Sequence, residues 1–317
     1  MYTIENIIRA VTRKSGDKLN IVLLCDNEED YITQLCATGH NFFIFNDMYD
    51  SQWKRSVEYT PVNLHRYPTH IMACERHYDF IIVFNRIHHW ERARDLSGIW
   101  HVPIIVVDLA SMPIGSQHPF HTKLVLDNPD RLLLRGETIS VGSTQLITDS
   151  WTSHYSAFST TINLPHNTVT RDLVDYKNNQ MLAVDCDLPE GYLQSLPLNL
   201  DEKFTPSLSF SAFFINFWQA ITPKMLEAMA LGIPVVTFES PDLQELIGNQ
   251  IVLMIDDMQL LNDPAVVHHL KNFDKIPKIR DNALEYVKQH SPEQFTDGWN
   301  GLFEYATNLS YTRDSYV

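Results

Sequence analysis

Short apolar runs rich in β-branched residues alternate with stretches of helical period along the chain, and this alternation limits the possible folds more than any other feature. The runs are predicted to be buried strands, in the order NIVLLC (20–25), NFFIF (41–45), FIIVF (80–84), IIVV (104–107), MLAVDCD (181–187), SFSAFFINFW (209–218), PVVTF (234–238) and IVLMI (251–255). Parallel strands need long crossover connections, which are usually helices. The sequence therefore predicts an α/β protein made of βαβ units, doubly wound around parallel sheets.

The helices between these runs and the chain length predict the domain organisation. The expected helices cover about 28–38, a segment from near Trp90, 223–231, 264–272, 278–290 and 292–308. The stretches 137–151 (ETISVGSTQLITDSW) and 160–169 (TTINLPHNTV) are expected to hold the last strands of the first half. A chain of 317 residues suggests two domains at about 150 residues each. We place a linker around 165–174 and predict domains over 1–168 and 169–292, with a closing segment over 293–317.

Charge and cysteine content restrict the partners and the compartment. The chain has 24 Lys and Arg against 39 Asp and Glu, a formal net charge of −15. That field repels nucleic acid and anionic lipid, so it disfavours both without excluding a local basic groove. The four cysteines (Cys25, Cys36, Cys74 and Cys186) form no C-x-x-C pair and lie in or beside apolar runs, which predicts buried reduced thiols. With no apolar stretch of about 18 residues and no signal-peptide pattern, we expect a cytoplasmic protein without a transmembrane segment.

The segment 217–238 (FWQAITPKMLEAMALGIPVVTF) carries the most chemical information. Thr222 is a good N-cap, Pro223 fits the first helical position, and Gly232 ends the helix before a buried strand. The amides and the positive dipole end of this helix would face a phosphate or diphosphate at the end of the preceding strand. Glu227, just over one turn into the helix, has the acceptor atoms to bind two vicinal hydroxyls such as those of a ribose.

The run 225–247 (MLEAMALGIPVVTFESPDLQELI) resembles the donor-site motif of GT-B glycosyltransferases of the large retaining class related to sucrose and glycogen synthases. In that class an E-x7-E pattern ends in E-A-M-A-x-G-x-P-V-V. The resemblance implies that Glu227, which matches the second Glu, holds the ribose. Gln219 stands at the position of the first Glu, which contacts the sugar, so it brings no carboxylate there. The amides that follow, those of Ala220 and Ile221, are implied to meet the sugar and phosphates.

The resemblance extends in both directions from this motif. The stretch 78–108 is similar to the acceptor-domain pattern of a strand, a helix and a V-P-hydrophobic strand, and 279–306 is similar to the closing helices. These matches imply two Rossmann-like domains that face a cleft, the GT-B fold. The first domain would bind the acceptor and the second the nucleotide-sugar donor, and the final helix, 293–317, would cross back to the first domain.

Two departures from the family affect the assignment of catalytic residues. Many relatives end the last acceptor-domain strand in a His that contacts the donor sugar, but here that position is Leu109, preceded by Asp108. Asp108 is therefore our candidate beside Gln219 for a contact to the reacting sugar. The Arg and Lys that relatives use to neutralise the diphosphate have no clear match either. Thr222 and Lys224 are assigned to the phosphates in their place.

Acceptor-side candidates follow two predicted strands of the first half. Asn85, Arg86 and His88 come directly after the FIIVF strand, and His118 and His121 lie in the Pro-, Gly- and Ser-rich segment that follows the IIVV strand. Ligands in open α/β sheets bind at the carboxyl ends of strands, so these side chains are candidates to line the acceptor site. No Cys or carboxylate cluster joins the two later histidines, and no metal site is expected.

The sequence thus favours a glycosyltransferase that uses a nucleotide-sugar donor, an unidentified glycan, lipid-linked or other hydroxyl acceptor, and no cofactor. The resemblance implies retention of configuration without an obligatory metal. Two alternatives stay open, namely a glycosyltransferase that acts on hydroxymethylated bases in DNA and a non-catalytic GT-B-like binding protein. A third, sugar-phosphate epimerisation, has no positive support. The chain lacks G-x-S-x-G, P-loop and G-x-G-x-x-G motifs, which disfavours elbow-type hydrolases, P-loop enzymes and dinucleotide dehydrogenases.

Overall fold

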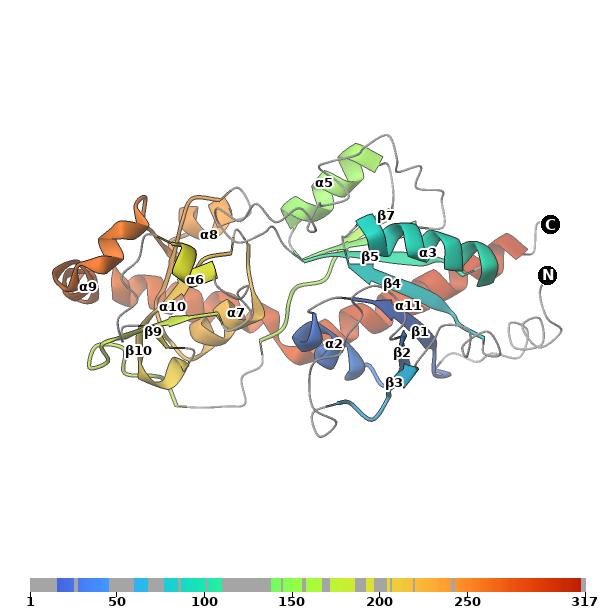
Figure 1. The fold of residues 1–317 in the computed structure, drawn as a ribbon, viewed down its shortest axis with the longest axis horizontal. Helices are drawn as coiled ribbons and strands as arrows, with labels where there is room; N and C mark the ends of the chain where they lie inside the picture. Colours follow the sequence, from blue (N-terminus) through green and yellow to red (C-terminus); the bar gives the residue numbers. More distant parts are fainter. Residues whose placement is uncertain are drawn as a thin grey trace. The chain divides into compact units, whose positions relative to one another are not determined.

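A computed structural model gives the fold of the protein (Figure 1), and it describes most of the chain in separate stretches. These are residues 16–25, 28–45, 60–67, 77–84, 87–100, 102–109, 138–143, 145–155, 158–166, 172–185, 192–196, 204–205, 207–218, 220–240 and 243–314. They form two compact units. Unit 1 holds the described residues up to Leu109, those from 138 to Ile162 and those from Phe295 onward, and unit 2 holds those from Asn163 to Gln294.

Unit 1 is built on one parallel sheet. Its strands are β1 (Asn20–Leu24), β2 (Asn41–Phe45), β3 (Leu64–Tyr67), β4 (Phe80–Phe84), β5 (Ile104–Asp108), β6 (Thr138–Gly142) and β7 (Phe158–Thr161). They are ordered β3-β2-β1-β4-β5-β6-β7, and each neighbouring pair is parallel. The helices are α2 (Glu29–Cys36), α3 (Ile87–Trp100), α5 (Gln145–Tyr155) and most of α11 (Pro292–Asp314).

Alternate residues of β4 show that helices cover both faces of this sheet. Ile81 and Val83 join the same buried cluster as Trp151 of α5, together with residues of α3. Phe80 points the other way, and its ring lies 5.9 Å from that of Phe303 in α11. Figure 1 shows α3 and α11 on opposite sides of the strands. The sheet is therefore buried on both faces, which explains why its central strands are continuously apolar.

The long helix α11 is fixed to unit 1 through aromatic contacts. The indole Nε1 of Trp299 donates a hydrogen bond of 3.1 Å to the hydroxyl of Tyr31 in α2, and both side chains are buried. The Tyr31 ring also packs edge-on against Phe84 of β4 and Phe295 of α11, at 5.6 and 5.2 Å between centroids. Burial raises the pKa of Tyr31 well above its ordinary value. These contacts make the end of the chain part of the unit 1 core.

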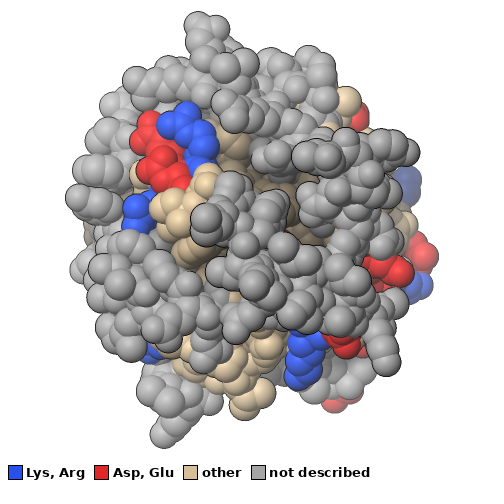
Figure 2. All heavy atoms as spheres, turned by 90° about the vertical axis from the view of Figure 1, so that its right-hand side faces the viewer, with Lys and Arg blue, Asp and Glu red and all other residues tan. Residues whose placement is uncertain are grey.

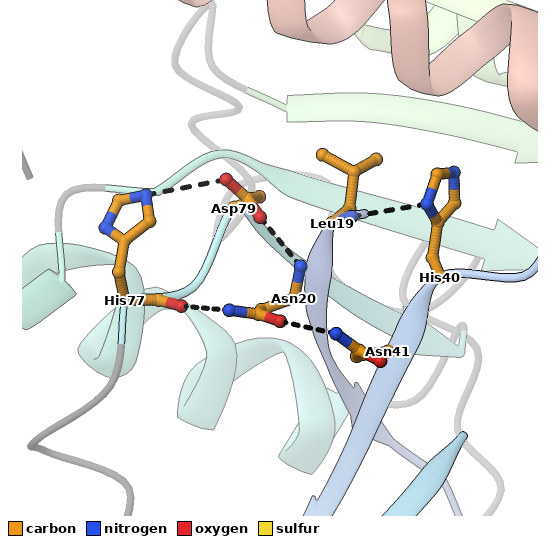
Figure 3. A network of polar contacts seen from close by, with 6 residues as sticks. All are labelled: Leu19, Asn20, His40, Asn41, His77 and Asp79. Carbon is orange, nitrogen blue, oxygen red and sulfur yellow. Dashed lines mark hydrogen bonds and ion pairs between the residues drawn. The ribbon is translucent and has the colours of Figure 1, made fainter. Parts of the chain in front are cut away.

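Polar side chains tie the amino ends of three unit 1 strands together (Figure 3). The backbone N–H of Asn20 donates to Oδ2 of Asp79 over 2.7 Å, and the Asn20 side chain donates to the carbonyl of His77 over 2.9 Å. Asn41 donates to Oδ1 of Asn20, and His77 Nε2 lies 3.4 Å from Oδ1 of Asp79. A buried carboxylate at a strand start is thus satisfied by neighbouring strands, and this network lies at the edge opposite the carboxyl ends where ligands bind.

Unit 2 is built on a second parallel sheet of shorter strands. These are β8 (Met181–Val184), β9 (Phe204–Thr205), β10 (Ser211–Asn216), β11 (Val235–Thr237) and β12 (Leu253–Met254), ordered β12-β11-β10-β8-β9. Its helices are α6 (Tyr192–Ser195), α7 (Pro223–Ala230), α8 (Gln244–Gly248), α9 (Pro264–Lys271) and α10 (Ile276–Val287), with 3₁₀ turns at Leu208–Phe210, Met258–Asn262 and Lys288–His290. Leu182 of β8 and Phe213 of β10 belong to the same buried cluster as Ile279 of α10.

The predicted α/β class with parallel sheets in two parts is confirmed. One prediction within unit 1 is wrong, and one strand was missed. The stretch 137–151 holds a strand only as far as Gly142, and α5 begins at Gln145 because Ile147 and Trp151 lie one turn apart on a buried helix face. The edge strand β3 was not predicted, since only Leu64 of its four residues is buried.

Cys25 and Cys36 are buried thiols, as expected, and burial raises the pKa of Cys36 to about 12. Cys74 and Cys186 lie outside the described residues.

Candidate functional site

The unit 2 sheet has a topological switch point beside the strand that leads into the predicted donor motif. From β8 the chain moves to β9 on one side and then to β10 on the other, and β10 pairs with β8 in parallel. In open α/β sheets, such a point leaves a crevice outside the carboxyl ends of the two strands, where ligands bind. The loop from β10 to α7 starts at this place. The topology therefore puts the motif at the expected ligand position of the unit.

The start of α7 follows the predicted capping pattern. Thr222 has extended backbone angles, with φ −114° and ψ 155°, and its hydroxyl accepts a hydrogen bond of 3.1 Å from the Met225 amide. Pro223 occupies the first turn. At the far end, Gly232 has φ +70° and turns the chain toward β11. The capping keeps the N-terminus of α7 well defined, and with it the positive end of the helix dipole.

Lys224 and Glu227 lie on the same side of the first two turns of α7 and pair with each other. Lys224 Nζ donates to Glu227 Oε2 over 2.9 Å. The Lys224 side chain is 24% exposed and that of Glu227 is 17% exposed, so both remain partly accessible to solvent. A cation and a carboxylate thus stand side by side at the capped end of the helix, and the buried residues Ala220 and Ile221 directly precede the N-cap in the chain. Five of the predicted donor-site residues are therefore neighbours.

Sequence analysis missed two residues at this end of unit 2. Asn216, the last residue of β10, is fully buried and bonds to the loop that precedes α7. In the sequence, Asn216 could have been noticed only as a single polar residue near the end of an apolar strand. His166 comes from the predicted linker, and its pKa is lowered by burial, an effect opposed by the nearby carboxylates of Glu293 and Glu227. The pKa of Glu293 is lowered in turn by hydrogen bonds from its own amide and from Ser291, and by His166. Only the fold brings His166 toward Glu227.

The two described first-unit candidates, His88 and Asp108, follow or end the adjacent strands β4 and β5. Asp108 ends β5 with a buried side chain, and its Oδ2 accepts a hydrogen bond of 3.0 Å from Nε1 of Trp151. The Ser143 hydroxyl donates to the carbonyl of Leu109 over 2.8 Å and fixes the chain just beyond. His88 lies in the first turn of α3 and is half-buried, with its ring 4.2 Å from that of His89. Contacts of these groups with a sugar remain a prediction.

Five of the predicted site residues cannot be placed, and the described residues show no metal-binding group or membrane-spanning helix. Gln219, Asn85, Arg86, His118 and His121 lie outside the described residues. Within the described parts of the chain, no group of three His, Cys, Asp or Glu side chains is placed to hold a metal ion. None of the described helices has the length and hydropathy needed to span a membrane. On the face drawn in Figure 2, the described acidic and basic side chains stand next to one another without a continuous basic stripe.

Comparison with known proteins rests on structure alone. No protein-family model matches the chain, and no curated protein matches it. HepE from Anabaena, solved in complex with UDP, is similar with a TM-score of 0.60 and 12% identity, covering 91% of this chain and 100% of that one. Sucrose-phosphate synthase from Thermosynechococcus elongatus follows with 0.59 and 12%, covering 90% and 98%. A glycosyltransferase from Rickettsia africae gives 0.58 and 12%, covering 92% and 99%.

These likenesses extend over almost the full length of both partners in each comparison, but they stop at the level of backbone structure. At 12% identity they establish the fold alone. The activity and the ligand of this protein have to be inferred from its own residues. The fold class predicted from the sequence is confirmed: the chain has the α/β fold with two parallel sheets that is found in GT-B glycosyltransferases.

Proposed function

We propose that this protein is a glycosyltransferase that takes a sugar from a nucleotide-sugar donor bound by unit 2. The observation that carries the proposal is the position of α7. Its capped N-terminus, with Lys224 and Glu227, follows the strand at the topological switch point of the unit 2 sheet. Anions bind well at such helix ends, and nucleotides bind at such switch points. HepE, a protein of similar fold, has been solved with UDP bound, which adds support for a nucleotide ligand.

Each residue at the end of α7 has a proposed role in donor binding. Glu227 accepts hydrogen bonds from the two vicinal ribose hydroxyls. Lys224, the Thr222 region and the amides of Ala220 and Ile221 bind the diphosphate, together with the positive end of the helix dipole. Gln219 contacts the sugar through hydrogen bonds. In the described part of α7 the cation proposed for the phosphates, Lys224, is already paired with Glu227, so we propose that oriented amides supply a large part of the stabilisation.

The proposed reaction breaks the bond between the anomeric carbon and the diphosphate oxygen and forms one between that carbon and the oxygen of an acceptor hydroxyl, whose proton passes to the departing diphosphate. Rate enhancement comes from holding the two substrates in line and from stabilising the departing diphosphate. We propose retention of configuration and no obligatory metal or cofactor. Asp108 is the proposed contact to the reacting sugar, and the acceptor-side candidates are Asn85, Arg86, His88, His118 and His121.

A thermal-shift panel with UDP-, GDP-, ADP- and CMP-sugars tests the donor site directly. A ligand that binds only the folded state at 100 times its Kd stabilises it by about 2.7 kcal/mol, so one nucleotide series should raise the melting temperature of the wild type. Glu227→Ala should abolish that response. Glu285→Ala is the matched control, because Glu285 also pairs with a lysine three residues away, Lys288, on an exposed part of unit 2. The donor-site proposal fails if no nucleotide sugar stabilises the wild type, or if Glu227→Ala responds as the wild type does.

Two further assays separate the remaining alternatives. Turnover of the stabilising nucleotide sugar in the presence of hydroxyl acceptors identifies an enzyme, whereas binding without turnover identifies a GT-B-like binding protein. A gel-shift with hydroxymethylated DNA at low and high salt tests the DNA-modifying alternative. The net charge of −15 leads us to expect no shift at either salt concentration. A salt-sensitive shift would move the proposed acceptor to DNA and leave the donor proposal in place.

A further inference from the structure

The side chain of Asn216 connects three parts of the loop that joins β10 to α7. Its Oδ1 accepts a hydrogen bond of 3.1 Å from the Trp218 amide. Its Nδ2 donates to the carbonyl oxygen of Ala220 over 3.0 Å and to Sδ of Met225 over 3.2 Å. Asn216 is fully buried, so these groups do not exchange their hydrogen bonds with water. One amide thus fixes the beginning and the end of the loop and the first turn of the helix.

This position requires both a donor and an acceptor on one short side chain. The Trp218 amide can only donate and the Ala220 carbonyl can only accept, so the amide group of Asn216 fits in one orientation. Asp has no N–H to give to Ala220. Ser carries one hydroxyl on a shorter stem, and Leu fills the space with no polar atom. The three contacts therefore depend on asparagine itself.

The bond to Ala220 also determines where the next amide points. The peptide between Ala220 and Ile221 is trans, and in a planar trans peptide the C=O and the N–H point in opposite directions. Because the Ala220 carbonyl is held toward the buried Asn216, the Ile221 N–H is directed away from it. This amide stands immediately before the N-cap of α7, where the helix dipole favours an anion.

We propose that Asn216 is a positioning residue of the donor site, which orients the Ala220–Ile221 peptide so that the Ile221 N–H donates to a phosphate oxygen of the bound nucleoside diphosphate. The proposal rests on the proposed function and adds a residue that itself touches no substrate. Loss of Asn216 frees the peptide to rotate, so the phosphate contact is lost while the ribose contact at Glu227 persists. A residue that only stabilises the loop would not distinguish between the two parts of the ligand.

The test compares a nucleoside diphosphate with its nucleoside on two uncharged variants, Asn216→Leu and Asn216→Ser. Neither adds a charge that would repel phosphate, and the serine variant covers the case that leucine prevents folding. The control is Ser211→Ala at the other end of β10, which removes the hydrogen bond of 2.7 Å from the buried Ser211 to the Ser207 carbonyl. Affinities for UDP, GDP and ADP and for uridine, guanosine and adenosine are measured by calorimetry, with competition for the weak ligands.

The expected result is a loss of about tenfold in affinity for the diphosphate that the wild type binds, with the matching nucleoside unchanged. Glu227→Ala should weaken both ligands together, and Ser211→Ala neither, whatever their melting temperatures. The inference fails, and the proposed function stands, if a folded Asn216 variant binds the diphosphate as the wild type does. The same holds if the variant loses equal affinity for the diphosphate and for the nucleoside. A wild type that binds none of the three diphosphates overturns this inference, and if no nucleotide sugar stabilises it either, the proposed function fails as well.

Discussion

Nζ of Lys224 donates to Oε2 of Glu227 over 2.9 Å, so the cation proposed for the phosphates and the carboxylate proposed for the ribose are paired with each other on one helix. A diphosphate that draws Lys224 away loosens this ion pair, and a ribose that bonds to Glu227 competes for the same carboxylate. The two ends of the proposed ligand would therefore be coupled through this pair. Binding energies of the two side chains should not be additive.

The first prediction follows from this coupling. Lys224→Ala should lower diphosphate affinity by about tenfold, and the Lys224→Ala/Glu227→Ala double variant should lose less than the sum of the single losses. Removing the pair should change the free energy of unfolding by only about 1 kcal/mol, since partly exposed ion pairs contribute little. Calorimetric titration and urea denaturation of all four proteins measure both quantities. Strict additivity in binding would show that the two residues contribute to binding independently, without coupling through their ion pair.

The second prediction concerns Gly232, which has φ +70° at the end of α7. A Cβ there would lie 2.8 Å from Nε of Arg280, so the arginine must shift in addition to the backbone strain. Gly232→Ala should lower the free energy of unfolding by about 1–3 kcal/mol. Gly248→Ala is the control, because it ends α8 with no atom within 4 Å of the added methyl group and should be neutral or stabilising. Equal urea midpoints for the two variants would contradict the argument.

The third prediction concerns the attachment of α11 to unit 1. Trp299→Ala removes a fully buried side chain and its hydrogen bond to Tyr31, so it should cost about 3–5 kcal/mol. Tyr305→Ala, further along the same helix, removes a ring that is 41% exposed and should cost clearly less. Chemical denaturation of the two variants gives the comparison. A Trp299 variant as stable as the Tyr305 variant would mean that α11 contributes little to the core of unit 1.

The fourth prediction is a loss of stability on acidification. Burial lowers the pKa of His290 below its ordinary value of 6.5, and the nearby His166 lowers it further, against a hydrogen bond between its Nδ1 and the Leu164 carbonyl. The folded state therefore binds fewer protons than the unfolded state in this pH range. The contribution of His290 to the free energy of unfolding is fully present above pH 6.5. It falls as the pH drops toward the folded-state pKa, by at most about 1.4 kcal/mol per pH unit.

His290→Gln should flatten this dependence when the free energy of unfolding is measured from pH 7.5 to 5. The exposed His268 of α9 provides the control, and His268→Gln should keep the wild-type profile. If both variants follow the wild type, the acid sensitivity of the protein comes from other groups.

The amino-acid pattern predicts those parts of the molecule that depend on neighbouring residues in the chain. The capped start of α7 is one example, because Thr222, Pro223 and the helix formers after them act within two turns. The strand β3 is the opposite case. Only its pairing with β2 makes the segment Leu64–Tyr67 a strand, and its own composition gives no signal. Likewise, the approach of His166 to Glu227 spans 61 positions and depends on the folding of all that lies between them.

In the candidate site, too, some residues could be predicted from the local sequence and others could not. Glu227 lies in a run that resembles known donor motifs, and Thr222 and Lys224 stand at the predicted start of the same helix, so the sequence around one helix was enough to single out all three. Asn216 acts through hydrogen bonds to backbone atoms of Trp218 and Ala220, whose side chains leave no trace of that role in the sequence. Residues that shape a loop by bonding to its backbone become visible only when the backbone itself is known.

The tie between Tyr31 and Trp299 also bears on the order in which the protein acquires its structure during synthesis. Unit 1 contains the earliest described strands, yet its aromatic core includes Phe295, Trp299 and Phe303 of the last helix. On the ribosome, β1 to β7 emerge first and expose the sheet face that α11 will cover. The described part of unit 2, from Asn163 to Gln294, emerges in between and has all the strands of its own sheet. Domains generally fold as units as they leave the ribosome, so the unit that is made first is completed last.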